Sequence, residues 1–208
     1  MSERGSYTLG IESAIGGGSV SLHRKGVEID GISGDGSISR AEELLPRIDE
    51  LLRHNGISIR DTDVIIVSSG PGSYTGIRVG IATVLGLRAS TNARCRGVSI
   101  LQAMTLLASG ETSTLTAVPM GRNMVCSQLF EHEQPTSLPS LNTTEEFIAS
   151  AINFAGKVVM HGSLFDEVKS PSSQRLINAG VNLASLVAAA AKSEFASDEL
   201  TPLFVDRQ

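Results

Sequence analysis

The residues best placed to do chemistry lie in a glycine-rich block, GPGSYTGIRVG at 70–80, which follows an apolar run. A glycine-rich turn before a helix can hold a phosphate, because the helix N-terminus presents free N–H groups and the positive end of its dipole. The glycines at 70, 72 and 76 do not follow G-x-G-x-x-G, and no lysine follows as in a Walker A loop. The alternative is a tight turn with glycines at positive φ. The spacing favours this structural turn.

Glu12 is the one carboxylate placed where a metal–nucleotide ligand could lie, because it ends a predicted first strand and precedes a glycine-rich segment. Close approach of a phosphate is compatible with that segment, and a structural turn is again the alternative. If a nucleotide binds this chain, we expect Glu12, Gly70 and Gly72 to lie near it.

The remaining reactive residues do not form a recognisable catalytic or metal-binding set. No G-x-S-x-G elbow is present, and Ser73 lies in G-S-Y-T-G instead. The histidines and cysteines are scattered without ligand spacing, so we expect surface or loop histidines rather than catalysts; they are His23, His54, His132, His161, Cys95 and Cys126. The sequence therefore predicts no catalytic residue, no metal and no cofactor.

Composition narrows the functional classes. The chain has 208 residues, a formal net charge of −5 and 41% apolar residues, enough for a buried core. An acidic balance argues against non-specific nucleic-acid binding by the whole surface, although a local basic patch is compatible with it. No signal peptide is visible at 1–10, the apolar runs are too short for a membrane span, and two cysteines cannot form a disulfide framework. We expect a cytoplasmic protein.

The elements that must position these residues alternate between strands and helices. Three short strands form a predicted antiparallel meander, and a helix follows that opens with a Ser39/Glu42 capping box and is kinked at Pro46. A second predicted capping box, Ser99/Gln102, opens a later helix. The expected strands are 7–12, 18–24, 27–33, 64–68, 96–98, 115–120, 124–131, 157–161 and 201–206, and the other expected helices are 75–89, 144–152 and 182–193. This pattern predicts an α/β fold with mixed sheets and two lobes, 1–108 and 109–208.

The first two helices each carry an unusual face. The first has a wide apolar stripe formed by Leu44, Leu45, Ile48, Leu51 and Leu52. The second has Gly76 and Gly80 one turn apart, with Thr83 and Val84 continuing that face. Interior glycines each cost a helix about 1 kcal/mol, so we expect a close packing partner, either the chain's own sheet or another subunit.

Three segments together resemble the bacterial TsaB family, formerly YeaZ: RAEELLPRID at 40–49, the VIIV strand, and GPGSYTGIRVGIATVLGL at 70–87. The likeness is strongest over 39–103 and fainter from 114 to 208. It implies the actin/hexokinase/Hsp70-like (ASKHA) fold of two RNase H-like halves, with a reduced second lobe. It also implies a non-catalytic subunit that supports TsaD, the enzyme that transfers a threonylcarbamoyl group to the adenosine beside the tRNA anticodon. The resemblance also implies that a TsaE-type ATPase completes the assembly, and that this chain reaches tRNA only through the assembled complex.

The resemblance further implies that the first two helices bind TsaD, or a second copy of the chain when it is alone. On this basis Gly80→Leu or Ile48→Asp is expected to abolish pairing and leave the isolated fold intact. The interface residues expected here are Leu44, Leu45, Ile48, Leu52, Gly76, Ile77, Gly80, Thr83 and Val84.

The chain departs from the family at two positions. The first strand ends Gly-Ile-Glu-Ser where an Asp-Thr-Ser type ending is usual, and Pro119 stands where an aspartate is common. The main alternative function is a small ATP-dependent sugar or acyl kinase of the same fold, which would use Glu12 and the glycine turns for Mg-ATP. A peptidase finds no supporting set of nucleophile, base or metal.

Overall fold

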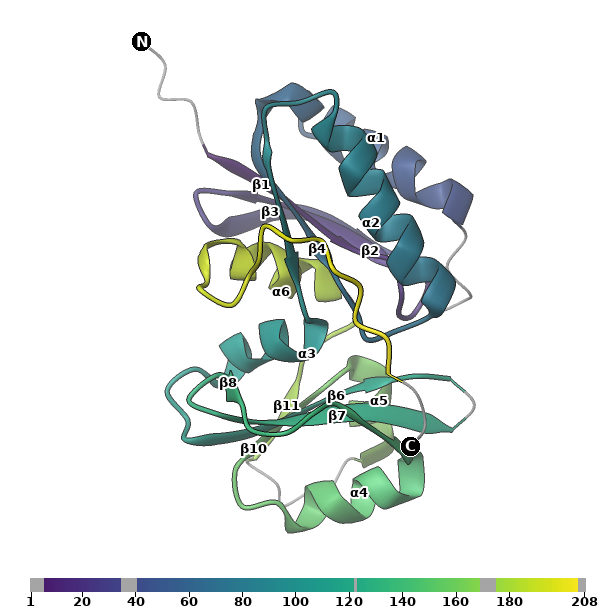
Figure 1. Cartoon of the computed structure of the whole chain (residues 1–208), viewed down its shortest axis with the longest axis vertical. Coiled ribbons are helices and arrows are strands. Elements are labelled where there is room, and N and C mark those ends of the chain that lie inside the picture. Colours follow the sequence, from purple (N-terminus) through teal and green to yellow (C-terminus); the bar gives the residue numbers. More distant parts are fainter. Residues whose placement is uncertain (1–5, 35–40, 122, 169–174, 206–208) are drawn as a thin grey trace.

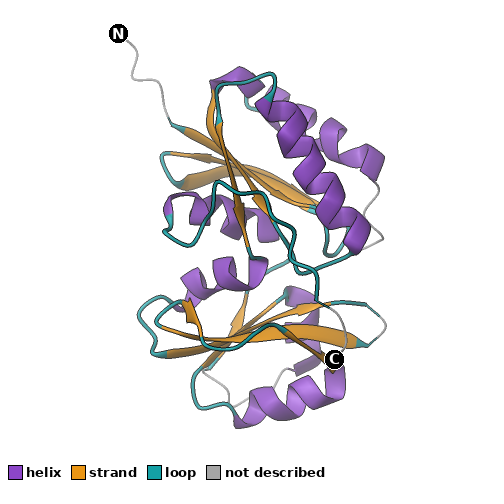
Figure 2. Cartoon of the chain, viewed as in Figure 1, coloured by secondary structure: helices purple, strands orange, loops and turns teal. Residues whose placement is uncertain are grey.

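The structure is a computed structural model that describes residues 6–34, 41–121, 123–168 and 175–205. Two mixed β-sheets form two lobes, one above the other in Figure 1, with helices on their faces (Figure 2). The strand order is β3-β2-β1-β4-β5 in the first sheet and β11-β10-β6-β7-β8 in the second, where β9 also pairs with β7. The predicted α/β class with mixed sheets is confirmed.

The first sheet combines a meander with a buried parallel core. β1 (Tyr7–Glu12), β2 (Ser19–Arg24) and β3 (Val27–Ser33) pair antiparallel as predicted. β4 (Thr62–Ser68) pairs parallel with both β1 and β5 (Arg94–Val98). The Val-Ile-Ile-Val run lies in β4, an interior strand of the sheet, where apolar residues are needed on both faces.

Helices cover both faces of the first sheet. The 3-10 helix η1 (Ala41–Glu43), α1 (Leu44–His54) and α2 (Tyr74–Arg88) lie on one face, with the 3-10 helix η2 (Ile59–Asp61) between them in the chain. Ser39 of the predicted capping box lies outside the described residues. Pro46 falls in the first turn of α1, where its missing N–H is not needed, so the reason for a predicted kink is absent.

The second lobe contains the predicted strand pair, which is antiparallel, the predicted helix, and the predicted strand at 157–161, which is parallel to β6. It also contains short elements that the sequence did not predict: α5, β8, β9 and β11. α4 opens with a capping box formed by Thr143 and Glu146. The capping box predicted at Ser99 is wrong, because the Ser99 side chain makes no capping hydrogen bond. The elements from α3 to β11 are α3 (Ile100–Ala103), η3 (Met104–Ala108), β6 (Ser113–Pro119), β7 (Met124–Glu131), β8 (Gln134–Pro135), β9 (Ser140–Thr143), α4 (Thr144–Asn153), β10 (Lys157–Met160), α5 (Gly162–Val168) and β11 (Leu176–Asn178).

After β11 the chain returns to the first lobe. α6 (Leu183–Ala189) and η4 (Ala190–Lys192) pack on the sheet face opposite α1 and α2, and the Ala184 N–H donates to Ser19 Oγ at 3.0 Å. The tail pairs at Gly97 and Ser197 as an isolated bridge, and the strand predicted at 201–206 does not form within the described residues. The boundary predicted at 108/109 therefore separates the two sheets but not these C-terminal residues.

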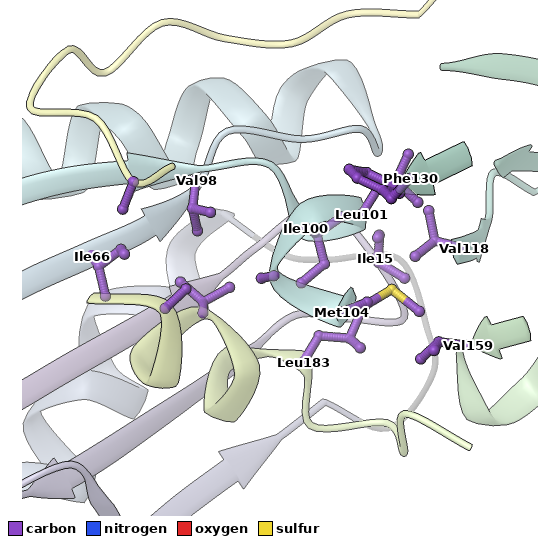
Figure 3. Packing of buried hydrophobic residues seen from close by; sticks show 14 of the residues in the cluster. Ile15, Ile66, Val98, Ile100, Leu101, Met104, Val118, Phe130, Val159 and Leu183 are labelled. Carbon is purple, nitrogen blue, oxygen red and sulfur yellow. The ribbon is translucent and has the colours of Figure 1, made fainter. Parts of the chain in front are cut away.

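The two lobes share an apolar core (Figure 3). Ile66 and Val98 come from the first sheet, Val118 and Val159 from the second, and Ile15 follows β1. The side chains of α3 lie between the lobes and contribute to the same cluster. Of the helices in the part of the chain that the structure describes, none is long and apolar enough to span a bilayer.

Candidate partner-binding site

The glycine-rich block joins β4 to α2 and packs against the segment that follows β1. Ser73 is the N-cap of α2, and its Oγ accepts the Gly76 N–H at 3.0 Å. The Ser73 N–H donates to the Ala14 carbonyl at 2.9 Å, and Ser13 Oγ donates to the Gly76 carbonyl at 2.8 Å. The N-terminal turn of α2 is thus bonded directly to Ser13 and Ala14.

Glycine is needed in α2 because this contact is so close. A Cβ added at Gly76 would lie 2.3 Å from the Ser13 carbonyl oxygen, and one at Gly80 would lie 2.3 Å from Ser13 Oγ. Neither position has room for a side chain unless the Ser13–Ala14 segment moves. The sequence left two packing partners open for the Gly76/Gly80 face, the chain's own sheet or another subunit. In the structure, residues of the same chain, Ser13 and Ala14, pack against it.

Most of the predicted interface side chains lie in the core of the first lobe. Leu44, Ile48, Leu52 and Val84 belong to the apolar cluster beneath α1 and α2, and Ile77 is fully buried. These side chains cannot touch a partner while the lobe stays folded. Their burial also corrects the expected effect of Ile48→Asp and Gly80→Leu, because both substitutions would damage the isolated fold.

Two of the nine predicted interface residues remain accessible. Leu45 on α1 is 55% exposed, and Thr83 on α2 is half-buried. The solvent side of α2 carries a stripe that sequence reasoning missed, formed by Tyr74, Arg78, Ala82 and Leu85. Their spacing of four, four and three residues could have indicated this second face.

The stripe begins with a stack of three side chains. The Arg78 guanidinium lies 4.0 Å from the centroid of the Tyr74 ring, and the rings of Tyr74 and Phe204 are 4.6 Å apart. Tyr74 is 53% exposed and Leu85 42%. Leu45 and the stripe together are here called the α1/α2 outer face, which exposes apolar side chains beside the charged Arg78.

Glu12 is buried and bound by the backbone that follows it. Its two carboxylate oxygens accept the N–H groups of Ala14 at 2.7 Å and Ile15 at 3.3 Å. Burial raises the pKa of Glu12 to about 7, although these N–H groups favour the charged form. A carboxylate held in this way is not open to a metal ion.

The glycine turns near Glu12 are also filled by the chain itself. Gly72 faces Ala14, and Gly70 faces Ile77 and the carbonyl of Leu203. In the glycine-rich segment that follows β1, Arg47 of α1 donates to the Gly17 carbonyl at 2.7 Å. The cavity beside Gly17 and Gly18 measures about 10 Å³. That volume holds about one water molecule and not a phosphate group.

Two histidines predicted at the surface or in loops are buried. His161 Nδ1 lies 2.8 Å from Ser163 Oγ, its Nε2 side faces Gly16 of the first lobe, and burial lowers the pKa of His161. His23 Nε2 lies 3.4 Å from Ser185 Oγ, and that hydroxyl donates to Glu28 at 2.8 Å. The serine proton therefore points to the carboxylate rather than to His23, and the three groups do not form a hydrolase relay.

Comparison with known proteins places these features in a family context. The family model described as tRNA N6-adenosine threonylcarbamoyltransferase (TsaD) matches residues 37–137. The Escherichia coli protein named tRNA threonylcarbamoyladenosine biosynthesis protein TsaB is 34% identical over 80 residues, which are 37% of this chain and 35% of that protein. A tRNA N6-adenosine threonylcarbamoyltransferase from Desulfovibrio desulfuricans is 34% identical over 117 residues, which are 55% of this chain and 32% of that enzyme.

The solved structures extend the likeness to the whole chain. YeaZ from Pseudomonas aeruginosa superposes with a TM-score of 0.65 at 21% identity, covering 96% of this chain and 100% of that one. A second P. aeruginosa structure, described as similar to peptidase YeaZ, gives a TM-score of 0.66 at 22% identity, with 97% and 100% covered. The chain is similar to TsaB (YeaZ) proteins, in sequence over part of its length and in fold over nearly all of it.

The likeness to TsaB covers less of the protein in sequence than in fold. In sequence it spans about a third of the length of the curated TsaB relative from E. coli, whereas in fold it spans the whole chain. The predicted ASKHA-type α/β fold is confirmed, since a polyphosphate/ATP-glucomannokinase from Arthrobacter also superposes with a TM-score of 0.52 at 9% identity. Among the described residues, no group of three or more His, Cys, Asp or Glu could hold a metal ion.

Proposed function

We propose that this chain is a non-catalytic subunit that binds a TsaD-type catalytic subunit in the biosynthesis of threonylcarbamoyladenosine in tRNA. The observation that carries the proposal is the α1/α2 outer face, which leaves Leu45, Tyr74 and Leu85 exposed although the inward sides of both helices are buried. Both helices fall within the residues matched by the TsaD family model. Exposed apolar patches of this kind mark protein–protein contacts.

The α1/α2 outer face has the composition of a helix-to-helix interface. Leu45 and Leu85 supply apolar anchors, and Tyr74 supplies an aromatic one. Charged side chains flank them, with Asp49 exposed on α1 and Arg88 exposed on α2. Such rim charges set orientation more than affinity.

The interior of the chain supports a binding role rather than catalysis. The carboxylate of Glu12 is enclosed, and the cavity beside the glycine turn is too small for a phosphate group. A TsaD-type subunit would carry out the transfer, a TsaE-type ATPase would join the assembly, and tRNA would be reached through the complex. The net charge of −5 is consistent with a chain that does not grip tRNA alone. Without the catalytic subunit, a second copy of the chain would occupy the same face.

The test is to mix the chain with the TsaD-type subunit of the same organism and measure binding by calorimetry. Leu85→Asp or Leu45→Asp places a charge in the proposed interface and is expected to weaken binding at least about 100-fold. Ile152→Asp is the matched control, because Ile152 is 57% exposed on α4 in the other lobe. Equal binding by Leu85→Asp and Leu45→Asp, or a loss confined to Ile152→Asp, would show that another surface is used.

A further inference from the structure

A pocket of about 340 Å³ opens on the second lobe, between α4 and the segment 136–139 that connects β8 to β9. α4 lies at the opposite end of the molecule from α1 and α2 (Figure 1). The volume falls in the range of about 300–1,000 Å³ that is usual for small-molecule sites. The proposed partner interface makes no use of this pocket.

Beside the pocket, one edge of β7 is paired with two short strands in turn rather than with one continuous strand. β7 pairs with β9 along Met124–Ser127 and with β8 along Phe130–Glu131. Between these ladders, Gln128 Nε2 donates to the Ser137 carbonyl at 2.8 Å and the Leu129 N–H donates to Ser137 Oγ at 3.1 Å. The Thr136 N–H also donates to the Leu129 carbonyl at 3.0 Å, so Thr136 and Ser137 hold the connecting segment against β7, where it forms one wall of the pocket.

The floor and walls of the pocket are apolar. Leu115 and Leu129 are direct partners in the β6–β7 pair, so their side chains project from the same face of the sheet. Phe147 of α4 and Phe154, just after α4, line the same space. Leu138 is 78% exposed and contributes to the lining from the connecting segment.

The polar groups in the lining are uncharged. They are the side-chain amides of Gln128 and Asn142 and several serine hydroxyls, and none of the described residues that line the pocket is charged. Amides and hydroxyls can satisfy a few hydrogen bonds of a neutral ligand. An ionised ligand would lose hydration without gaining an opposite charge, so this lining selects against it.

We propose that this pocket binds a small neutral ring compound, a heteroaromatic with one or two hydrogen-bonding groups. The ring would pack against Phe154, because aromatic faces and edges attract each other beyond the effect of area alone. Phe147, which is 1% exposed, would lie beneath it as part of the floor. Its polar edge would meet the side-chain amide of Asn142 and the serine hydroxyls in the lining. The concave shape and the volume favour a small molecule over a helix or strand of another protein.

The test uses indole as a neutral probe and indole-3-carboxylate as its anionic counterpart, titrated into the ¹⁵N-labelled full chain. We expect indole to cause saturable chemical-shift changes at the amides of Leu129, Leu138 and Ser150, with at least about tenfold weaker binding of the carboxylate. Ser150→Trp should fill the pocket from the exposed side of α4 and weaken indole binding by about tenfold or more. Ala149→Trp is the matched control, since Ala149 is exposed on the same helix but does not line the pocket.

Four results would overturn the proposal. The first is no saturable chemical-shift change with indole, and the second is equal binding of indole and its carboxylate. The third is unchanged indole binding by Ser150→Trp. The fourth is chemical-shift changes at the pocket amides only when a TsaD-type subunit is added. The last result would make the pocket a protein contact. Because none of these readouts depends on the α1/α2 outer face, they are separate from the test of the proposed function.

Discussion

Gly76 and Gly86 lie in the same helix, α2, but in different surroundings. A Cβ at Gly76 would meet the Ser13 carbonyl and the Ala14 Cα, whereas one at Gly86 would meet nothing within 4 Å. Gly86→Ala is therefore expected to stabilise the chain by about 0.5–1 kcal/mol through helix propensity. Gly76→Ala is expected to destabilise it by about 1–3 kcal/mol, because overpacking outweighs the same gain. Urea unfolding of both variants measures the two changes in the free energy of unfolding. Changes of the same sign would contradict the close contact between Gly76 and the Ser13–Ala14 segment.

Glu12 gives a second prediction at the scale of one residue. The folded chain keeps this proton up to about pH 7, whereas the unfolded chain releases it near the ordinary value of 4.5. The free energy of unfolding should therefore fall as the pH rises through this window, by about 2 kcal/mol between pH 5 and pH 8. Glu12→Gln removes the titrating group, so its unfolding curves should lack that part of the decline. Parallel slopes for the two proteins would show that Glu12 is not the source.

Arg96 connects two elements, β5 and the end of α6. Its guanidinium donates to the carbonyl of Ala191 at 2.6 Å and to the carbonyl of Ala196, which closes the carboxyl end of the α6–η4 segment. Arg96→Ala would leave these buried carbonyls unpaired, and we expect a loss of about 3 kcal/mol or more in the free energy of unfolding. Arg94 shares Asp198 with it but is largely exposed, so Arg94→Ala should change stability little. Thermal unfolding distinguishes the two variants. Similar losses of stability would argue against a stabilising role for the buried hydrogen bonds of Arg96.

The elements that sequence reasoning predicted are those with a strong local signal. The meander alternates with glycine breaks, and the Val-Ile-Ile-Val run of β4 is apolar at every position, so both could be assigned without tertiary information. α5, β9 and β11 are seven residues or fewer, and such short elements form through their neighbours. The packing of α6 on the first sheet was missed for the same reason, since only long-range contacts such as Ala184 with Ser19 place it there.

Seven of the nine predicted interface residues are buried in the first lobe, and the use of α1 and α2 to bind a partner stays a prediction. A stripe of Leu44, Ile48 and Leu52 indicates one apolar side, and burial against the chain's own sheet accounts for all of it. The sequence does not state which glycine contacts are intramolecular, because Ser13 and Gly76 are 63 residues apart. The outward stripe from Tyr74 to Leu85 mixes polar and apolar residues, so its periodicity is weak.

At the scale of the whole molecule, the two lobes are joined by a common apolar core. Val98 and Val118 come from different sheets and belong to one cluster, with α3 between the lobes (Figure 3). Opening the space between the lobes would expose this cluster. A chain built in this way presents rigid outer faces, and the α1/α2 outer face is the one that we propose for the catalytic partner.

Thiol labelling at Ala82 tests this central claim most directly. The native cysteines, Cys95 and Cys126, are both buried, and burial raises the pKa of each thiol, so neither should react readily. Ala82→Cys places a reactive thiol in the α1/α2 outer face, and Ala149→Cys places one on α4 as the control. The account predicts that the TsaD-type subunit slows labelling at position 82 by about tenfold or more while labelling at position 149 is unchanged. Equal labelling at position 82 with and without bound partner would contradict it.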